Sequence, residues 1–271
     1  MAFGNVLKKE PKKEAPPQQA AGGAAGPEGD DGLGGWNNVW GALAARDGLS
    51  DNINPNIYGE ITADGCALMF KNLPTAARLD EDSIIYDLGS GYGKLCIWCA
   101  TVAKRRCIGI ENNPDRAALA DKAKELAISK GFLSEEEQAR VTLITGDAFA
   151  EGAFLDATHI YMCNVGYSED MHLRLLDQVP KCKNLKAVIT ITAMHEGGHA
   201  VPAGALEKAG VRYEGSSVAP TTWDAECKVH YYTTAKGREP EPLRLKLADA
   251  EKFQSLVNDV YGEVMANVKE A

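Results

Sequence analysis

One stretch of the chain has the residue types and spacing of a zinc protease. Residues 195–199 read His-Glu-Gly-Gly-His, which fits the H-E-x-x-H pattern in which two histidines on a helix bind a metal and the glutamate acts as base. Here the pattern directly follows the β-branched run 187–192, and each of its two glycines costs a helix interior about 1 kcal/mol relative to alanine. We therefore predict a polar turn after a strand, with a metal site as the alternative.

A glycine-rich loop, YDLGSGYGK at residues 86–94, is a second candidate site. Its three glycines are Gly89, Gly91 and Gly93. Glycines let a ligand approach the backbone closely, and the helix that follows offers its positive N-terminus to the ligand. Asp87 stands before the loop and can accept from an amino group. A phosphate-binding P-loop would need Ser or Thr after Gly-Lys, but Leu95 stands there, so we disfavour that alternative.

Two more acidic side chains stand where predicted strands end. Glu111 lies at about the distance from the glycine loop at which an acidic residue binds ribose hydroxyls in dinucleotide folds, and a carboxylate there indicates a ribose without a 2′-phosphate. Asp147 can accept from an adenine amino group, with Ala148 and Phe149 beside the ring. With Asp87, these residues predict an adenosine-containing ligand.

Cysteine usage and charge limit the classes of protein. Cys96 and Cys99 form a single C-x-x-C without the second pair that a tetrahedral zinc site needs, so we predict buried thiols. Seven cysteines without a framework-like spacing predict reduced thiols and an intracellular, soluble protein, and no apolar run is long enough for a membrane helix. A net charge of -9 argues against a chain that coats nucleic acid through bulk charge.

The elements that must position these side chains alternate between strand and helix. We predict strands at 83–88, 106–111, 140–148, 158–164 and 185–194, separated by helices at 92–104, 114–130 and 168–179, and then an antiparallel pair at 213–223 and 228–236. The alternation predicts an α/β fold with a doubly wound, mostly parallel sheet.

The chain divides into four predicted segments. They are a disordered tail at 1–33, a helical lobe with a ligand-covering loop at 34–80, the main domain at 81–236, and a linker with an amphipathic helix at 237–271.

Five strands that alternate with helices are followed by an antiparallel pair. This order resembles that of class I methyltransferases, whose seven-stranded sheet is Rossmann-like. The glycine pattern is D-x-G-x-G-x-G rather than the G-x-G-x-x-G of dehydrogenases, which favours S-adenosylmethionine (SAM) over NAD.

A more specific resemblance spans about residues 53–234. Tyr58-Gly59-Glu60 precedes the D-L-G-S-G-x-G loop, and G-I-E, G-D, N-x-x-Y, a tryptophan and a Tyr-Tyr pair follow in order. This series resembles the disruptor-of-telomeric-silencing (DOT1) family, the non-SET methyltransferases that modify a lysine on the globular core of histone H3.

The resemblance implies a role for each matching residue. Tyr58, Gly59 and Glu60 would cover SAM, Asp87 would hold its amino group, Glu111 its ribose, and Asp147 its adenine amine. Asn164 would lie between the methyl donor and the lysine, and the walls of the lysine channel would be Tyr167, Trp223 and Tyr231. The chain departs from the family at Cys163, at Ala148 and at residues 167–169. No histidine is placed as a general base, because His230 points to the face opposite Tyr231.

The resemblance therefore implies a SAM-dependent histone-lysine N-methyltransferase that acts on nucleosomes in the nucleus. Two alternatives remain open: a methyltransferase for a non-histone protein or small molecule, and a SAM-binding chromatin module without activity. The lysines at positions 8, 9, 12 and 13 form the compact basic cluster of the tail and predict a weak contact with DNA phosphates.

Overall fold

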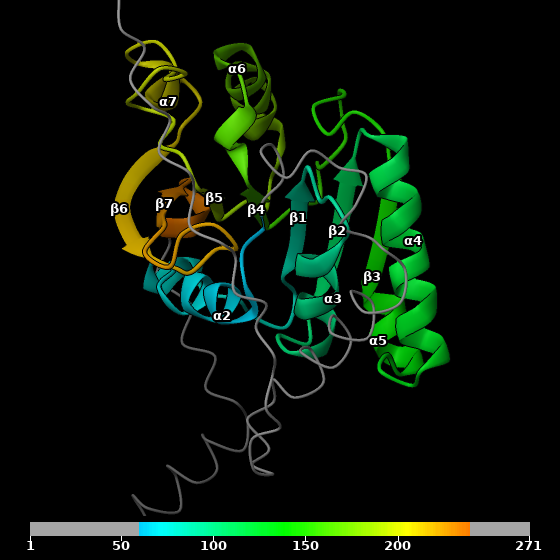
Figure 1. The fold of residues 1–271 in the computed structure, drawn as a ribbon. Helices are drawn as coiled ribbons and strands as arrows, with labels where there is room; N and C mark the ends of the chain where they lie inside the picture. The colour runs from blue at the N-terminus through cyan, green and yellow to red at the C-terminus, as the bar shows by residue number, and fades with distance from the viewer. Residues whose placement is uncertain (1–59, 239–271) are drawn as a thin grey trace, which may run out of the picture. The chain divides into compact units, whose positions relative to one another are not determined.

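A computed structural model describes residues 60–238, which form a seven-stranded sheet with helices on both faces (Figure 1). The strand order is β3-β2-β1-β4-β5-β7-β6. The strands are β1 (Ile84–Leu88), β2 (Arg106–Glu111), β3 (Val141–Thr145), β4 (His159–Met162), β5 (Ala187–Thr190), β6 (Arg212–Val218) and β7 (Lys228–Thr233). Strands β1 to β5 pair in parallel, whereas β7 runs antiparallel to β5 and β6. The predicted class I methyltransferase fold is confirmed.

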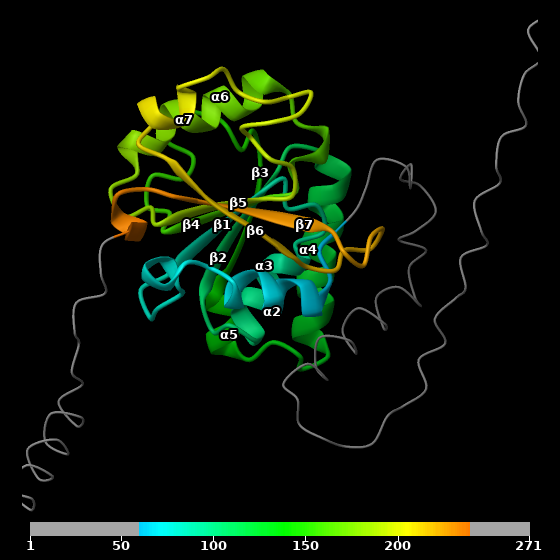
Figure 2. The same cartoon turned by 90° about the vertical axis from the view of Figure 1, so that its left-hand side faces the viewer.

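The helices form one layer on each face of the sheet, as Figure 2 shows for α6 and α7 against α2, α3 and α5. The helices are α2 (Ala63–Lys71), α3 (Lys94–Thr101), α4 (Pro114–Ser129), α5 (Glu135–Arg140), α6 (Glu169–Gln178) and α7 (Ala205–Lys208). Four 3-10 turns join them: η1 (Thr75–Ala77), η2 (Asn164–Gly166), η3 (Val179–Lys181) and η4 (Lys236–Arg238). Two apolar cores result, one on each face, since the central parallel strands are covered on both sides.

Side-chain caps fix where several helices begin. The Asn113 side chain accepts from two backbone N–H groups of α4, and the Ser168 side chain accepts from one backbone N–H group of α6. Helix α5 is absent from the sequence-based assignment, although Ser134 and Glu137 form a reciprocal capping box at its start. That S-x-x-E signal precedes no apolar run, so the hydrophobic periodicity gave no sign of this short helix.

The H-E-x-x-H stretch at residues 195–199 lies in a loop of bends and a turn after β5, which confirms the predicted turn. The Nδ1 atom of His195 lies 3.0 Å from the Tyr232 hydroxyl. Within residues 60–238, no group of three His, Cys, Asp or Glu side chains is placed to hold a metal ion.

The seven cysteines are all free thiols, and six of them are buried. The Cys96 and Cys107 sulfurs lie 3.3 Å apart, and burial raises the pKa of the Cys99 thiol to about 11. The prediction of buried thiols at Cys96 and Cys99 is confirmed.

Several predictions fall outside the described residues. They are the tail at 1–33, the part of the helical lobe before residue 60, and the amphipathic helix after residue 238. The rest of the lobe contains α2 and η1, which pack against the core over α3. None of the helices within residues 60–238 is long and apolar enough to cross a membrane.

Candidate active site

A pocket opens at the carboxyl ends of β1 and β4, where open α/β sheets bind their ligands. It contains about 350 Å³ of empty space, part of which is open to solvent. Its lining residues are Glu60, Ile61, Asp87, Gly89, Ser90, Gly91, Lys94, Leu95, Tyr161 and Cys163. A smaller hollow shares Ser90 and reaches Glu111. The structure thus brings together the predicted Glu60, Asp87, Glu111 and glycine loop.

The glycine loop has the backbone conformation that its composition predicts. Gly89, Gly91 and Gly93 all have positive φ angles, of 85°, 55° and 74°. The N–H groups of Gly89 and Ser90 both donate to the Ile110 carbonyl, which ties the loop to β2. A side chain at residue 89 would displace Tyr167, because its Cβ atom would lie 2.1 Å from the Tyr167 hydroxyl. The loop therefore needs glycine both for its turn and for this close approach.

Asp87 is the buried acid of the pocket, with only 4% of its surface exposed. Burial, and after it the negative charges of Glu111 and Glu60, together raise the pKa of its carboxyl group to about 8. Two acidic side chains thus line the pocket, and the third, Glu111, lines the hollow beside it. Such a pocket suits a ligand with a positive charge, because an ammonium group would stabilise the ionised form of Asp87.

Glu111 links the glycine loop to the start of α4. Its carboxylate oxygens accept from the Gly91 N–H and from the Asn113 N–H, each over 2.8 Å. Each oxygen has lone-pair capacity beyond these bonds, so the side chain can also accept from ribose hydroxyls.

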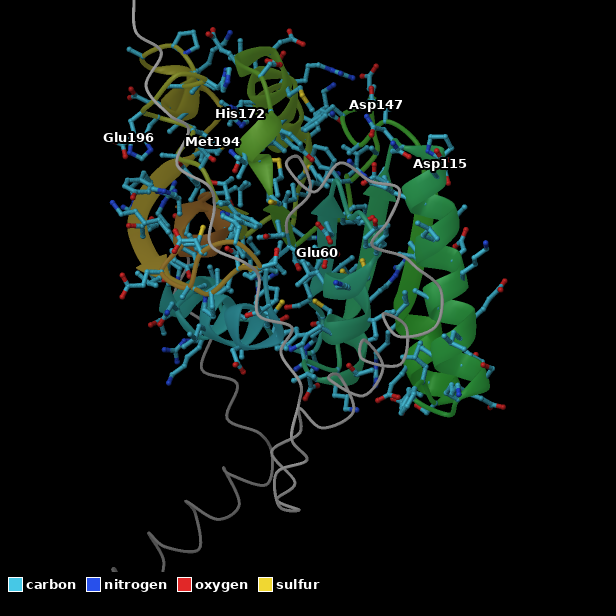
Figure 3. All side chains as sticks on the ribbon, viewed as in Figure 1. Glu60, Asp115, Asp147, His172, Met194 and Glu196 are labelled. Atoms are coloured by element: carbon cyan, nitrogen blue, oxygen red, sulfur yellow. The ribbon has the colours of Figure 1, made fainter. Side chains whose placement is uncertain are left out.

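Glu60 lies at the pocket and is held there by the loop between β6 and β7. Its N–H donates to the Thr222 hydroxyl over 3.1 Å, and the Thr222 N–H donates back to the Glu60 carbonyl over 2.8 Å. The Glu60 carboxylate forms an ion pair with Lys94, the first residue of α3. Figure 3 shows Glu60 near the middle of the molecule. Tyr58 and Gly59, the other predicted covering residues, lie outside the described range.

Asp147 is half exposed and pairs with Arg174 of α6 over 2.5 Å. It also accepts from the Phe149 N–H, and these bonds lower the pKa of its carboxyl group. Ala148 and Phe149 are buried, and the Phe149 ring meets the Tyr167 ring edge-on at 5.6 Å between centroids. The adenine contact of Asp147 stays a prediction, and in this structure the carboxylate is already bonded to Arg174.

Asn164 is fully buried, and every group of its side-chain amide has a partner. Its oxygen accepts from the Ile191 and Thr192 N–H groups over 3.1 and 2.8 Å. Its nitrogen donates to the Thr192 carbonyl and lies 2.9 Å from the Nε2 atom of His172. The side chain therefore holds the end of β4 against the chain that follows β5, and a direct role in methyl transfer stays a prediction.

The three predicted channel walls lie in different surroundings. The Tyr167 hydroxyl donates to the Leu88 carbonyl over 2.7 Å, beside the glycine loop. Tyr231 is buried in the core on the α2 face, with its hydroxyl 2.7 Å from that of Ser217. Trp223 lies in the loop between β6 and β7 and is 47% exposed. Their joint role as a lysine channel stays a prediction.

Sequence reasoning missed several lining residues, among them Lys94, Tyr161 and Cys163. Lys94 follows the glycine loop directly, so its place was readable from the motif. Tyr161 is a residue of a buried strand, and its position beside Asp87 depends on the pairing of β1 with β4, which no local signal reveals.

The Glu111→Ala variant is expected to bind SAM about 1.5–3 kcal/mol more weakly, the range for hydrogen bonds to charged groups. Isothermal titration calorimetry measures this, with Glu125→Ala as the control, because Glu125 is an exposed residue of α4. Wild-type affinity in the folded Glu111→Ala protein would remove the ribose assignment.

Comparisons with known proteins identify the family of the chain. A family model described as histone methylation protein DOT1 matches residues 50–234. Solved structures with a similar fold include precorrin-6y C5,15-methyltransferase from Geobacter metallireducens GS-15, which is 16% identical over 63% of this chain and 86% of that chain, with a TM-score of 0.42. Fibrillarin from Aeropyrum pernix with bound SAM is 13% identical over 63% of this chain and 76% of that chain, with a TM-score of 0.44. The search of curated proteins found no match. Because the family model covers more than half of the sequence, the chain belongs to the DOT1 histone methylation family of SAM-dependent methyltransferases.

Proposed function

We propose that this methyltransferase modifies a lysine on the globular core of histone H3 in nucleosomes, and that it acts in the nucleus. The DOT1 family match over residues 50–234 is the observation that carries this proposal. The pocket supports it, because Asp87 lies buried beside Glu60 and Glu111 at the site where the family resemblance places SAM.

The residues of the pocket fit SAM at each of its polar ends. Asp87 suits the amino group, and Lys94 is a cation of the pocket lining that suits the carboxylate. Glu111 suits the ribose hydroxyls.

Bound SAM supplies a methyl group on a positively charged sulfur. The lysine ammonium must first release a proton to water, and an apolar, aromatic channel favours this step because desolvation lowers the pKa of the amine. The nitrogen lone pair then forms the N–C bond, while the electron pair of the C–S bond moves to sulfur and the positive charge to the methylated nitrogen. The protein contributes mainly by holding the two reactants in line.

The experiment that tests the proposal supplies methyl-labelled SAM to nucleosomes, free histones and a cell extract in parallel, with mass spectrometry to find the label. We expect label on a lysine of the H3 globular core, and more of it with nucleosomes than with free histones. Label on a non-histone protein or a small molecule alone would overturn the histone substrate, and no label in any sample would overturn catalysis.

Nucleosome binding should depend on the basic cluster of the N-terminal tail, because the chain carries a net charge of -9. Deletion of residues 1–33 is expected to preserve SAM affinity and to lower activity on nucleosomes, most strongly at low salt, where phosphate contacts are least screened. Each phosphate contact contributes about -0.9 to the log–log salt slope, so four lysines can make only a weak contact.

A salt series with the truncated and full-length proteins measures this effect, and free histone H3 is the control substrate. Equal nucleosome activity of the two proteins at every salt concentration would show that the tail is not the anchor.

A further inference from the structure

The hydroxyl group of Tyr161 is buried in the wall of the pocket without a hydrogen-bond partner. The residue is 3% exposed and lines the pocket with Asp87 and Cys163. Among residues 60–238, its hydroxyl is the one buried side-chain oxygen for which no partner is present. A buried polar group without a partner destabilises a fold, so a native structure that keeps one calls for an explanation. A bound ligand atom would provide one.

Strand pairing places Tyr161 between Asp87 of the SAM site and Tyr231 of the predicted lysine channel. Asp87 of β1 pairs with Tyr161 of β4, Tyr161 pairs with Ile189 of β5, and Ile189 pairs with Tyr231 of β7. Residues paired in register point to the same face of a sheet, so these four side chains form one row. Asp87 marks the SAM end of the row, and Tyr231 is a predicted wall of the lysine channel. Tyr161 therefore lies in this row between the predicted SAM end and the predicted wall of the lysine channel.

The chemistry of this hydroxyl is that of a neutral phenol. Burial raises its pKa well above the ordinary value, and the neighbouring Cys163 and Asp87 act in the same direction. The group cannot act as a general base in this state, but its oxygen can accept a hydrogen bond. The nearby Tyr231 hydroxyl differs, because it already donates to the Met69 carbonyl and contacts Ser217.

We propose that Tyr161 is a further catalytic residue whose hydroxyl oxygen accepts an N–H of the acceptor amine. This contact leaves the nitrogen lone pair free to attack the methyl carbon. The inference rests on the proposed lysine substrate. Before each transfer the acceptor ammonium loses one proton to water. The transfer then forms one N–C bond and breaks one C–S bond, whose electron pair goes to sulfur, so the methylated nitrogen carries the positive charge.

The contact would also limit how many methyl groups are added. Every transfer replaces an N–H of the amine with a methyl group, and the hydroxyl occupies space that an added methyl group needs. Tyr161 therefore favours the first transfer over the third.

The Tyr161→Phe variant of the full chain tests the proposal, because it removes only the hydroxyl. We expect SAM affinity to stay within twofold, kcat for the first methyl transfer to fall about 3- to 10-fold, as for the loss of one hydrogen bond, and the trimethylated fraction of the product to rise. Tyr86→Phe is the matched control, since that hydroxyl lies in the core on the other face and donates to Asp156. Wild-type kcat and product distribution, or a loss confined to SAM affinity, would overturn the proposal.

A second readout separates this inference from the histone proposal. Binding of n-butylamine to the protein saturated with S-adenosylhomocysteine can be followed by NMR titration, and Tyr161→Phe is expected to weaken it about 3- to 10-fold. If wild-type protein labels no histone lysine but shows this difference, the histone substrate is wrong and the role of Tyr161 stands. Equal butylamine affinity of the two proteins would contradict the role of Tyr161 whatever the substrate is.

Discussion

The Asp87→Asn variant should be more stable than the wild type without SAM, yet lose SAM binding. The folded pKa of Asp87 is about 8, against an ordinary value of 3.8. Below pH 3.8 both folded and unfolded states are protonated, and as pH rises from 3.8 toward 8 only the unfolded state releases its proton, so the carboxyl group lowers stability across this window. At pH 7 its replacement by a neutral amide is expected to raise the free energy of unfolding by roughly 2–4 kcal/mol.

Denaturant unfolding at pH 4 and pH 7 measures the stability of this variant, and calorimetry measures its affinity for SAM. The stability gain should be large at pH 7 and small at pH 4. Asp177→Asn is the control, because Asp177 is exposed on α6. A variant that is no more stable than the wild type and still binds SAM would show that Asp87 is not the recognition group.

The Asn164→Ala variant should be strongly destabilised and should lose methyl transfer. The substitution leaves the buried Ile191 and Thr192 N–H groups without their acceptor, and each such loss costs about 1–3 kcal/mol. We expect the free energy of unfolding to fall by roughly 3 kcal/mol or more. At temperatures where the variant is folded, SAM affinity should stay within a few-fold, because Asn164 is not among the residues that line the pocket.

Denaturant unfolding, SAM calorimetry and single-turnover methyl transfer separate these effects. The control is Asn72→Ala, an exposed asparagine at the C-terminal end of α2. Full activity of Asn164→Ala would show that the residue has no role in methyl transfer. Unchanged stability would show that the hydrogen bonds of its side-chain amide do not stabilise the fold.

The sheet and its glycine loop were predictable because their causes are local. Each central strand is a short apolar run between helices with their own periodicity, and the Gly89–Gly93 spacing identifies the ligand loop. The burial of Asp87 follows from the same pattern, since the residue lies next to the end of a strand covered on both faces.

The surroundings of the site depend on contacts between residues far apart in the sequence. Glu60 is bonded to Thr222, 162 residues away, and Asp147 is paired with Arg174 of the helix after β4. Asn164 is an example of the same difficulty, because its partners come from the chain after β5 and from His172. The motif identified the residue, whereas its four side-chain hydrogen-bond contacts depend on packing that no motif encodes.

The most direct test of the SAM site is the proton balance of SAM binding at pH 7. Asp87 is mostly protonated at this pH when its pKa is about 8, and pairing with the ligand ammonium lowers that pKa. Calorimetric titrations in two buffers with different ionisation enthalpies should therefore show the release of most of one proton per SAM bound. Asp87→Asn protein, at concentrations high enough to bind SAM, should release almost none. Heats that do not depend on the buffer in wild-type protein would contradict the assignment of Asp87 and of the pocket built around it.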